Sequence, residues 1–165
     1  MTKTNFTATA LFVLSLTGCG AQSGIPPENI PAGYVAPPMP DATENSKTIA
    51  GIDSNTNGVR DDVEIYIYTN YSKPEEQKAL MQFAKMEQNA LLTVKTKEDV
   101  SNIYYPAMSK AISCEEKVFG WHDQSWKKLN SQILNTMDRV KQDLEVGRLM
   151  GGGVYEDTWK GDPCE

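Results

Sequence analysis

Apolar positions recur at helical spacing along the second half of the chain. Residues 61–71 carry apolar and aromatic side chains on all sides, which predicts a short, well-buried helix. A second helix is predicted over 74–94, because Ser72 begins a capping pattern and Pro74 suits a first helical turn. Its facing rows contain Leu80, Phe83, Glu87, Ala90, Leu91 and Val94.

A third helix is predicted to begin after Thr96, where Asp99 follows three residues later as in a capping box, and to end at Gly120. Its inward face combines Val100, Tyr104, Ala107, Ala111, Cys114 and Val118. Pro106 lies inside this run, so we expect a kink or break near Tyr105.

A fourth helix is predicted from a cap at Asp123 to the glycines at 151–153. Its inward stripe is Leu129, Ile133, Met137, Val140 and Leu144. Because no alternating strand pattern of useful length occurs, the predicted class is mainly α, an irregular four-helix array. Residues 47–165 form the single folded domain, which is large enough for its own core.

The segment 19–46 is rich in proline, glycine and small polar residues, as in Ala36-Pro37-Pro38-Met39-Pro40. Proline fixes the backbone and lacks an amide donor, so this composition predicts a disordered, extended tether ahead of the domain.

The N-terminus has the layout of a secretory signal. Lys3 precedes an apolar run from Phe6 to Leu16, which ends in small residues and is too short to span a bilayer as a helix. We expect residues 1–18 to be a signal peptide that is removed.

The residues Leu16-Thr17-Gly18-Cys19 resemble the lipobox of bacterial lipoproteins. This resemblance implies a diacylglyceryl group on the Cys19 thiol and usually a further acyl chain, such as palmitate, on its amine, which together anchor a protein stably. Gly20 in place of Asp implies delivery to the outer membrane, facing the periplasm or the cell surface. The alternative is an ordinary secreted protein with a cysteine near its cleavage site.

The net negative charge of the chain excludes some classes of binding partner. The formal net charge is -6, and it becomes about -7 without residues 1–18, which contain Lys3 and no acidic residue. An acidic protein is repelled by nucleic acid and by anionic lipid headgroups. We therefore expect no nucleic-acid partner and a surface suited to cations.

Two cysteines remain if Cys19 carries lipid. In an exported protein, Cys114 and Cys164 are expected to form a disulfide. The alternative is two unpaired thiols.

Residues 53–64 read Asp-Ser-Asn-Thr-Asn-Gly-Val-Arg-Asp-Asp-Val-Glu, and this spacing of oxygen-bearing residues resembles the calcium loop of the EF-hand family. Gly58 falls at the sharp turn. The resemblance implies calcium as the cofactor, with six ligands: Asp53, Asn55, Asn57, the carbonyl of Val59, Asp61 and Glu64.

The loop departs from that family in two ways. The incoming segment has little helical pattern, and Arg60 stands where paired EF-hands carry an aliphatic residue. We expect an isolated loop with a Kd of about 10⁻⁴ to 10⁻³ M, with Arg60 offsetting part of the negative field. The alternative is an Asn- and Asp-rich turn that only caps the following helix.

The sequence gives little indication of a catalytic or sugar-binding site. His122 is the single histidine, no nucleophile elbow is present, and the indoles of Trp121, Trp126 and Trp159 suit packing better than sugar stacking. The sequence favours a lipid-anchored calcium-binding envelope protein that acts as a binding or structural module for an envelope protein or polysaccharide. The alternatives are a small envelope hydrolase using carboxylates, and an inhibitor or immunity protein against an envelope toxin.

Overall fold

The structure is a computed structural model that describes residues 24–156 and 160–164. Its described part is mainly α-helical, as predicted, and contains no strand. The helices are α1 (Ala42–Ser46), α2 (Asp61–Asn70), α3 (Pro74–Thr93), α4 (Lys97–Asp99), α5 (Tyr105–Phe119), α6 (Ser125–Ile133) and α7 (Met137–Met150). A 3₁₀ turn, η1 (Pro27–Asn29), and a π-helical turn, η2 (Val100–Tyr104), complete them.

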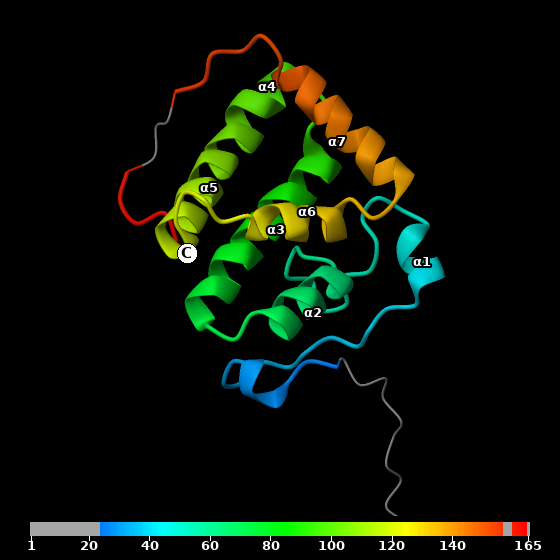
Figure 1. Ribbon diagram of the computed structural model, residues 1–165. Coiled ribbons are helices and arrows are strands. Elements are labelled where there is room, and N and C mark those ends of the chain that lie inside the picture. The colour runs from blue at the N-terminus through cyan, green and yellow to red at the C-terminus, as the bar shows by residue number, and fades with distance from the viewer. Residues whose placement is uncertain (1–23, 157–159, 165) are drawn as a thin grey trace, which may run out of the picture.

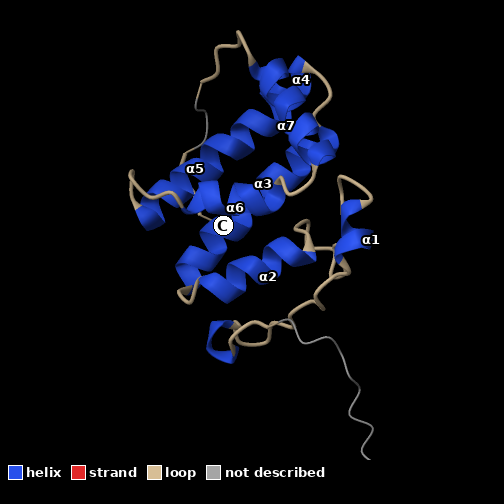
Figure 2. Cartoon of the chain, turned by 45° about the vertical axis from the view of Figure 1, so that its right-hand side comes forward, coloured by secondary structure: helices blue, strands red, loops and turns tan. Residues whose placement is uncertain are grey.

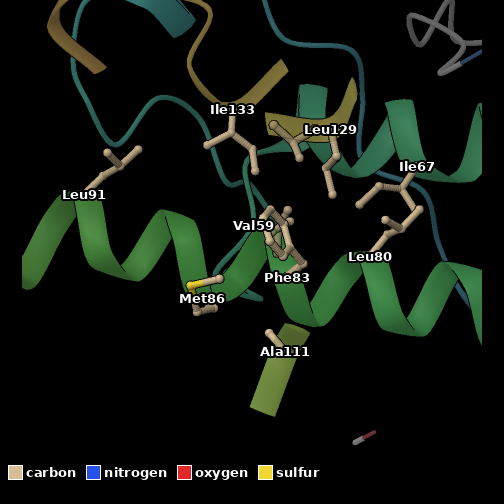
Figure 3. Packing of buried hydrophobic residues seen from close by; sticks show 11 residues of the cluster. Val59, Ile67, Leu80, Phe83, Met86, Leu91, Ala111, Leu129 and Ile133 are labelled. Carbon is tan, nitrogen blue, oxygen red and sulfur yellow. The ribbon is translucent and has the colours of Figure 1, made fainter. Parts of the chain in front are cut away.

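The long helix α3 is the centre of the fold. It packs against α2, α5, α6 and α7, and Figure 1 shows α5 running beside it while α2 and α6 cross its other side. The main core lies where these elements meet (Figure 3), and its fully buried members include Val59, Ile67, Leu80, Leu91, Ala111 and Leu129. Val59 belongs to the loop before α2, so this loop is fixed to the core through its own side chain.

The first two predicted helices are confirmed to within a residue at each end. The predicted cap at Ser72 is wrong. The N-cap of α3 is Lys73, and no side chain bonds to the first turn, so Pro74 without an amide hydrogen and the acidic residues behind it begin this helix instead.

The third predicted helix is built from α4, η2 and α5 in continuous succession. The capping box of Thr96 and Asp99 is confirmed, and Gly120 ends α5 at a φ of 86°. Near Pro106 the chain widens into the π-helical turn, where the Tyr105 amide bonds to the carbonyl of Val100. This wider turn makes room for the proline ring, which would otherwise collide with the preceding turn, so the helix deforms without breaking.

The fourth predicted helix is wrong as a single element, because the chain divides into α6 and α7. Thr136 accepts the Arg139 amide and begins α7 anew after a break at 134–136. The changed direction leaves Met137 and Leu144 exposed at 68% and 66%, and α7 buries Val146 and Leu149 instead. The predicted cap Asp123 does accept the Ser125 amide, although the N-cap position is Gln124.

The described part of the proline-rich segment, residues 24–46, lies on the domain rather than extending as the expected tether (Figure 2). Ile25 is buried against Ile65 and Tyr68 of α2. Asn29 donates its side-chain amide to the Tyr68 carbonyl at 2.9 Å, and its own carbonyl accepts from the Gln77 amide at 2.8 Å. Prolines set this path, but the scattered apolar and aromatic side chains between them provide the packing.

The tail is tied to α5 by the predicted disulfide between Cys114 and Cys164, which is confirmed. Lys117 pairs with Asp162 beside it, and the Gln82 side chain donates to the Pro163 carbonyl. Across the described ranges, no helix is both long enough and apolar enough to cross a membrane.

Candidate metal site in the loop before α2

The predicted ligands Asp53, Asn55 and Asn57 lie in one tight loop that leads into α2. Both oxygens of Asp53 accept backbone amides across the turn, from Asn57 at 3.2 Å and from Gly58 at 2.9 Å. Gly58 has a φ of 90°, a conformation that L side chains rarely adopt, so glycine at this position is required by the turn. The first predicted ligand therefore closes the loop on itself.

The side chains of Asn55 and Asn57 converge on Glu64, the predicted last ligand. Their amide groups donate to its two carboxylate oxygens, at 3.0 Å and 2.8 Å respectively. Rotating an asparagine amide by half a turn exchanges its oxygen and nitrogen with little change in shape. Such a rotation would turn both amide oxygens toward a cation held by Glu64, but it would give up the bonds that these oxygens accept from the backbone amides of Asn57 and Val59, at 3.3 Å and 2.9 Å.

Asp61 is fully buried at the start of α2. Its Oδ1 accepts the Ser54 amide at 3.0 Å, whereas its Oδ2 is buried and has no hydrogen-bond partner. A buried carboxylate oxygen without a donor is costly, typically by about 1–3 kcal/mol or more. Among the side-chain oxygens of the predicted ligands, Asp61 Oδ2 is the one that is buried without a donor.

Glu64 is held by a residue that the sequence pattern did not single out. The Tyr34 hydroxyl, from the proline-rich segment, donates to Glu64 Oε1 at 2.5 Å, and the Tyr34 ring packs on Tyr68 with ring centres 4.7 Å apart. Tyr34 and the isoleucines beside the prolines are the sequence signals that this segment docks.

The loop brings two buried carboxylates, Asp61 and Glu64, close together. Burial raises the pKa of the Glu64 carboxyl above its usual range, and the charge of Asp61 adds to this, while the hydrogen bonds from Tyr34, Asn55 and Asn57 oppose it. Burial and the bond to Glu64 likewise raise the pKa of the Tyr34 hydroxyl. A bound cation would relieve the repulsion between the two carboxylates.

Arg60 does not act on the loop as expected. Its guanidinium is fully buried and points to the end of α6, where it donates to the carbonyls of Ile133 and Gln132 and pairs with Asp62. Burial opposes ionisation of Asp62, but the bonds and charge of Arg60 prevail and lower the pKa of that carboxyl. Arg60 is therefore neutralised by its own partners and by a helix C-terminus.

A second buried arginine fixes the segment that enters the loop. Arg139 of α7 is fully buried and donates to the backbone carbonyls of Asn45, Thr48 and Ile49, and to the Asn135 side chain. Burial and the nearby Arg60 charge lower its pKa to about 10. A side chain built on Gly51 would overlap both arginines, so glycine is required where the chain passes them.

The loop does not reach the density of acidic ligands found in many metal sites. Among the described residues, no three His, Cys, Asp or Glu side chains gather in a way that could hold a metal by themselves. A cation here would depend on the two asparagine oxygens and the Val59 carbonyl in addition to Asp53, Asp61 and Glu64, which are hard oxygen ligands of the kind that calcium takes. The predicted lipidation residue Cys19 and the indole of Trp159 lie outside the described residues.

Comparison of this chain with protein-family models, with curated proteins and with solved structures gives no match.

Proposed function

We propose that this protein is a lipid-anchored calcium-binding protein of the bacterial cell envelope, in which calcium stabilises a binding or structural module. The observation that carries the calcium proposal is Asp61 Oδ2, a buried acceptor without a donor inside a loop where every EF-hand ligand position holds an oxygen.

The donor set also favours calcium over other metals. Carboxylate, amide and carbonyl oxygens are hard ligands, and neither His nor Cys occurs in residues 53–64. Magnesium requires a tighter octahedral shell than a twelve-residue loop of this kind provides. When bound, calcium would supply charge neutralisation and cross-linking of the loop, with no catalytic step required of it.

The expected position of calcium gives it a structural role. Val59, whose carbonyl is one of the proposed ligands, buries its side chain in the main core, and Glu64 accepts a hydrogen bond from Tyr34 of the docked N-terminal segment. A cation that orders this loop would therefore stabilise the junction of α2, the core and residues 24–46.

The anchoring proposal rests on Leu16-Thr17-Gly18-Cys19. The first described residues, from Gly24, pack beside α2, so a lipid on Cys19 would hold the α2 side of the domain near the membrane surface. Cells that express the protein should incorporate a labelled fatty acid into it, and Cys19→Ser should abolish the label. Wild-type protein that takes up no label would contradict the anchoring proposal.

Thermal melting of the domain tests the calcium proposal. At a Kd of about 10⁻⁴ M, calcium at about 2 mM should stabilise the folded state by roughly 1.8 kcal/mol, since binding to the folded state alone contributes RT ln(1 + [L]/Kd). In a domain of this size the gain corresponds to a shift on the order of 5 °C. Glu64→Gln should remove most of the shift, whereas Glu98→Gln, at an exposed residue of α4, should retain it.

A further inference from the structure

A cavity of about 400 Å³ lies among α3, η2, α5 and α6, apart from the residues of the calcium loop. Its volume falls within the range of small-molecule sites. The wall is largely apolar and includes two indole rings. Its apolar residues are Phe83, Met108, Ile112, Trp121 and Trp126.

Acidic side chains line the same cavity, and none of its described lining residues is basic. Glu87 comes from α3, Glu115 and Glu116 from α5, and Asp123 from the connection to α6. Such an arrangement repels anionic ligands.

Two acceptor atoms in this wall have no hydrogen-bond partner, Glu115 Oε1 and Asn130 Oδ1. Glu115 is only 6% exposed, and the Trp126 backbone amide donates to its carboxyl group, so the remaining oxygen depends on a donor from elsewhere. Buried acceptors are normally paired. Both atoms lie just beneath the wall of the cavity, where a small turn of either side chain would bring its oxygen to a donor bound inside.

Two buried carboxyls beside the cavity hold their protons more tightly than exposed carboxyls do. Burial, together with the charges of Asp143 and Asp123 respectively, raises the pKa of Glu87 and of Glu115 to about 7 in each case. A positively charged ligand would stabilise the ionised forms of both.

We propose that this cavity binds a small organic cation, an ammonium group carried on an apolar body. The ammonium pairs with the Glu115 carboxylate and donates to Glu115 Oε1 and Asn130 Oδ1 once these buried atoms turn toward it, and the body packs against Met108, Ile112 and the indole of Trp126. A neutral sugar could donate to the same two acceptors, but it would leave the carboxylate charge uncompensated. The site is independent of calcium and of the lipid anchor.

The indoles at the opening fit the same ligand class. Trp121 is 82% exposed and Trp126 is 39% exposed, which is unusual for so large an apolar ring. The Lys127 ammonium lies 5.4 Å from the centre of the Trp126 ring, so this indole already attracts one cation. Cation–π attraction at the rim would add to the hydrogen bonds inside.

A matched pair of ligands tests the proposal on the unmodified domain. Titration calorimetry at about pH 8, where carboxyls with a pKa near 7 are mostly ionised, compares 2-phenylethylammonium with 2-phenylethanol, which has the same ring and chain without the charge. The amine should bind saturably, at least about tenfold tighter than the alcohol, and should change the tryptophan fluorescence. Equal affinities, no saturable amine binding, or tighter binding of a neutral glucoside than of the amine would each overturn the proposal.

Variants locate the site. Glu115→Gln keeps the shape of the side chain and should weaken amine binding at least about tenfold, because the buried charge is lost. Glu98→Gln, at an exposed residue of α4 that does not line the cavity, should bind the amine as the unmodified domain does. Circular dichroism checks that each variant folds, and the ligand comparison on the unmodified protein remains decisive if Glu115→Gln does not. Unchanged amine affinity in a folded Glu115→Gln variant would contradict the assignment of the site.

Discussion

Replacing Glu87 by Gln should stabilise the protein above neutral pH and leave it unchanged in acid. Glu87 is 8% exposed on α3, and burial together with the charge of Asp143 raises its pKa to about 7 from an ordinary value of 4.5. Since each unit of difference in pKa between folded and unfolded states corresponds to about 1.36 kcal/mol, the ionised carboxylate costs the folded state about 3 kcal/mol.

The direction of the effect follows from proton binding. Between about pH 4.5 and pH 7 the folded state holds the Glu87 proton more tightly than the unfolded chain does, so the free energy of unfolding falls as pH rises through this window. Below the window both states are protonated, and above it the loss is complete. Gln is neutral throughout, so the variant escapes the loss.

Urea unfolding of the two proteins at about pH 4, 6 and 8 measures this difference, which should grow from near zero to about 3 kcal/mol. The other acidic groups around the cavity, Glu115, Glu116, Asp123 and Asp143, are present in both proteins, so their direct contributions largely cancel. The exposed variant Glu98→Gln should follow the unmodified protein at every pH. A Glu87→Gln stabilisation that is the same at pH 4 and pH 8 would refute the reasoning.

Three further perturbations test other parts of the structure. Tyr34→Phe removes a donor from buried Glu64 and should destabilise the calcium-free protein by about 1–3 kcal/mol, with a smaller loss in calcium, as urea unfolding in each condition would reveal. Arg139→Met leaves the carbonyls of Asn45, Thr48 and Ile49 without their donor and should cost about 3–5 kcal/mol, whereas a loss under 1 kcal/mol in the same assay would contradict its role. Reducing the Cys114–Cys164 disulfide, which closes a separation of 50 residues, should cost on the order of 4 kcal/mol in chemical unfolding, and an unchanged midpoint would show that the tail adds no stability.

Local sequence rules predicted the parts of the fold that local forces determine. The capping box at Thr96, the turn at Gly120 and the run of α3 depend on neighbouring residues, and all three are confirmed. The sequence also predicted the disulfide, because the expectation that Cys19 carries lipid leaves one possible pairing, and the Cys114–Cys164 bond is confirmed.

Features that depend on distant contacts were not predictable from spacing. The apolar stripe through Met137 and Leu144 continued the pattern of α6, but Thr136 begins a new helix that buries a different face. The spacing of apolar positions does not single out Arg139, and only the folded chain brings three backbone carbonyls to its guanidinium. Thr136 followed by an acidic first turn was the available signal for the break.

In the candidate sites too, contacts between residues close in sequence were predictable, and contacts between distant segments were not. Asp53, Asn55, Asn57 and Glu64 lie within one twelve-residue loop, so their spacing was sufficient to predict that they meet. Spacing did not predict the hydrogen bond from Tyr34 to Glu64, because Tyr34 belongs to a segment expected to be a free tether. Apolar packing of Ile25 on α2 holds this segment against the domain. The cavity acids belong to separate helices, and no sequence spacing relates Glu87 to Glu115.

Calorimetric titration of the metal-free domain with calcium tests the central claim most directly. The account predicts one calcium per chain with a Kd of about 10⁻⁴ to 10⁻³ M, much weaker binding of magnesium, and loss of the calcium signal in Asp61→Asn and Glu64→Gln but not in Glu98→Gln. Absence of binding heat, together with identical melting curves in calcium and in chelator, would show that residues 53–64 form only a turn ahead of α2.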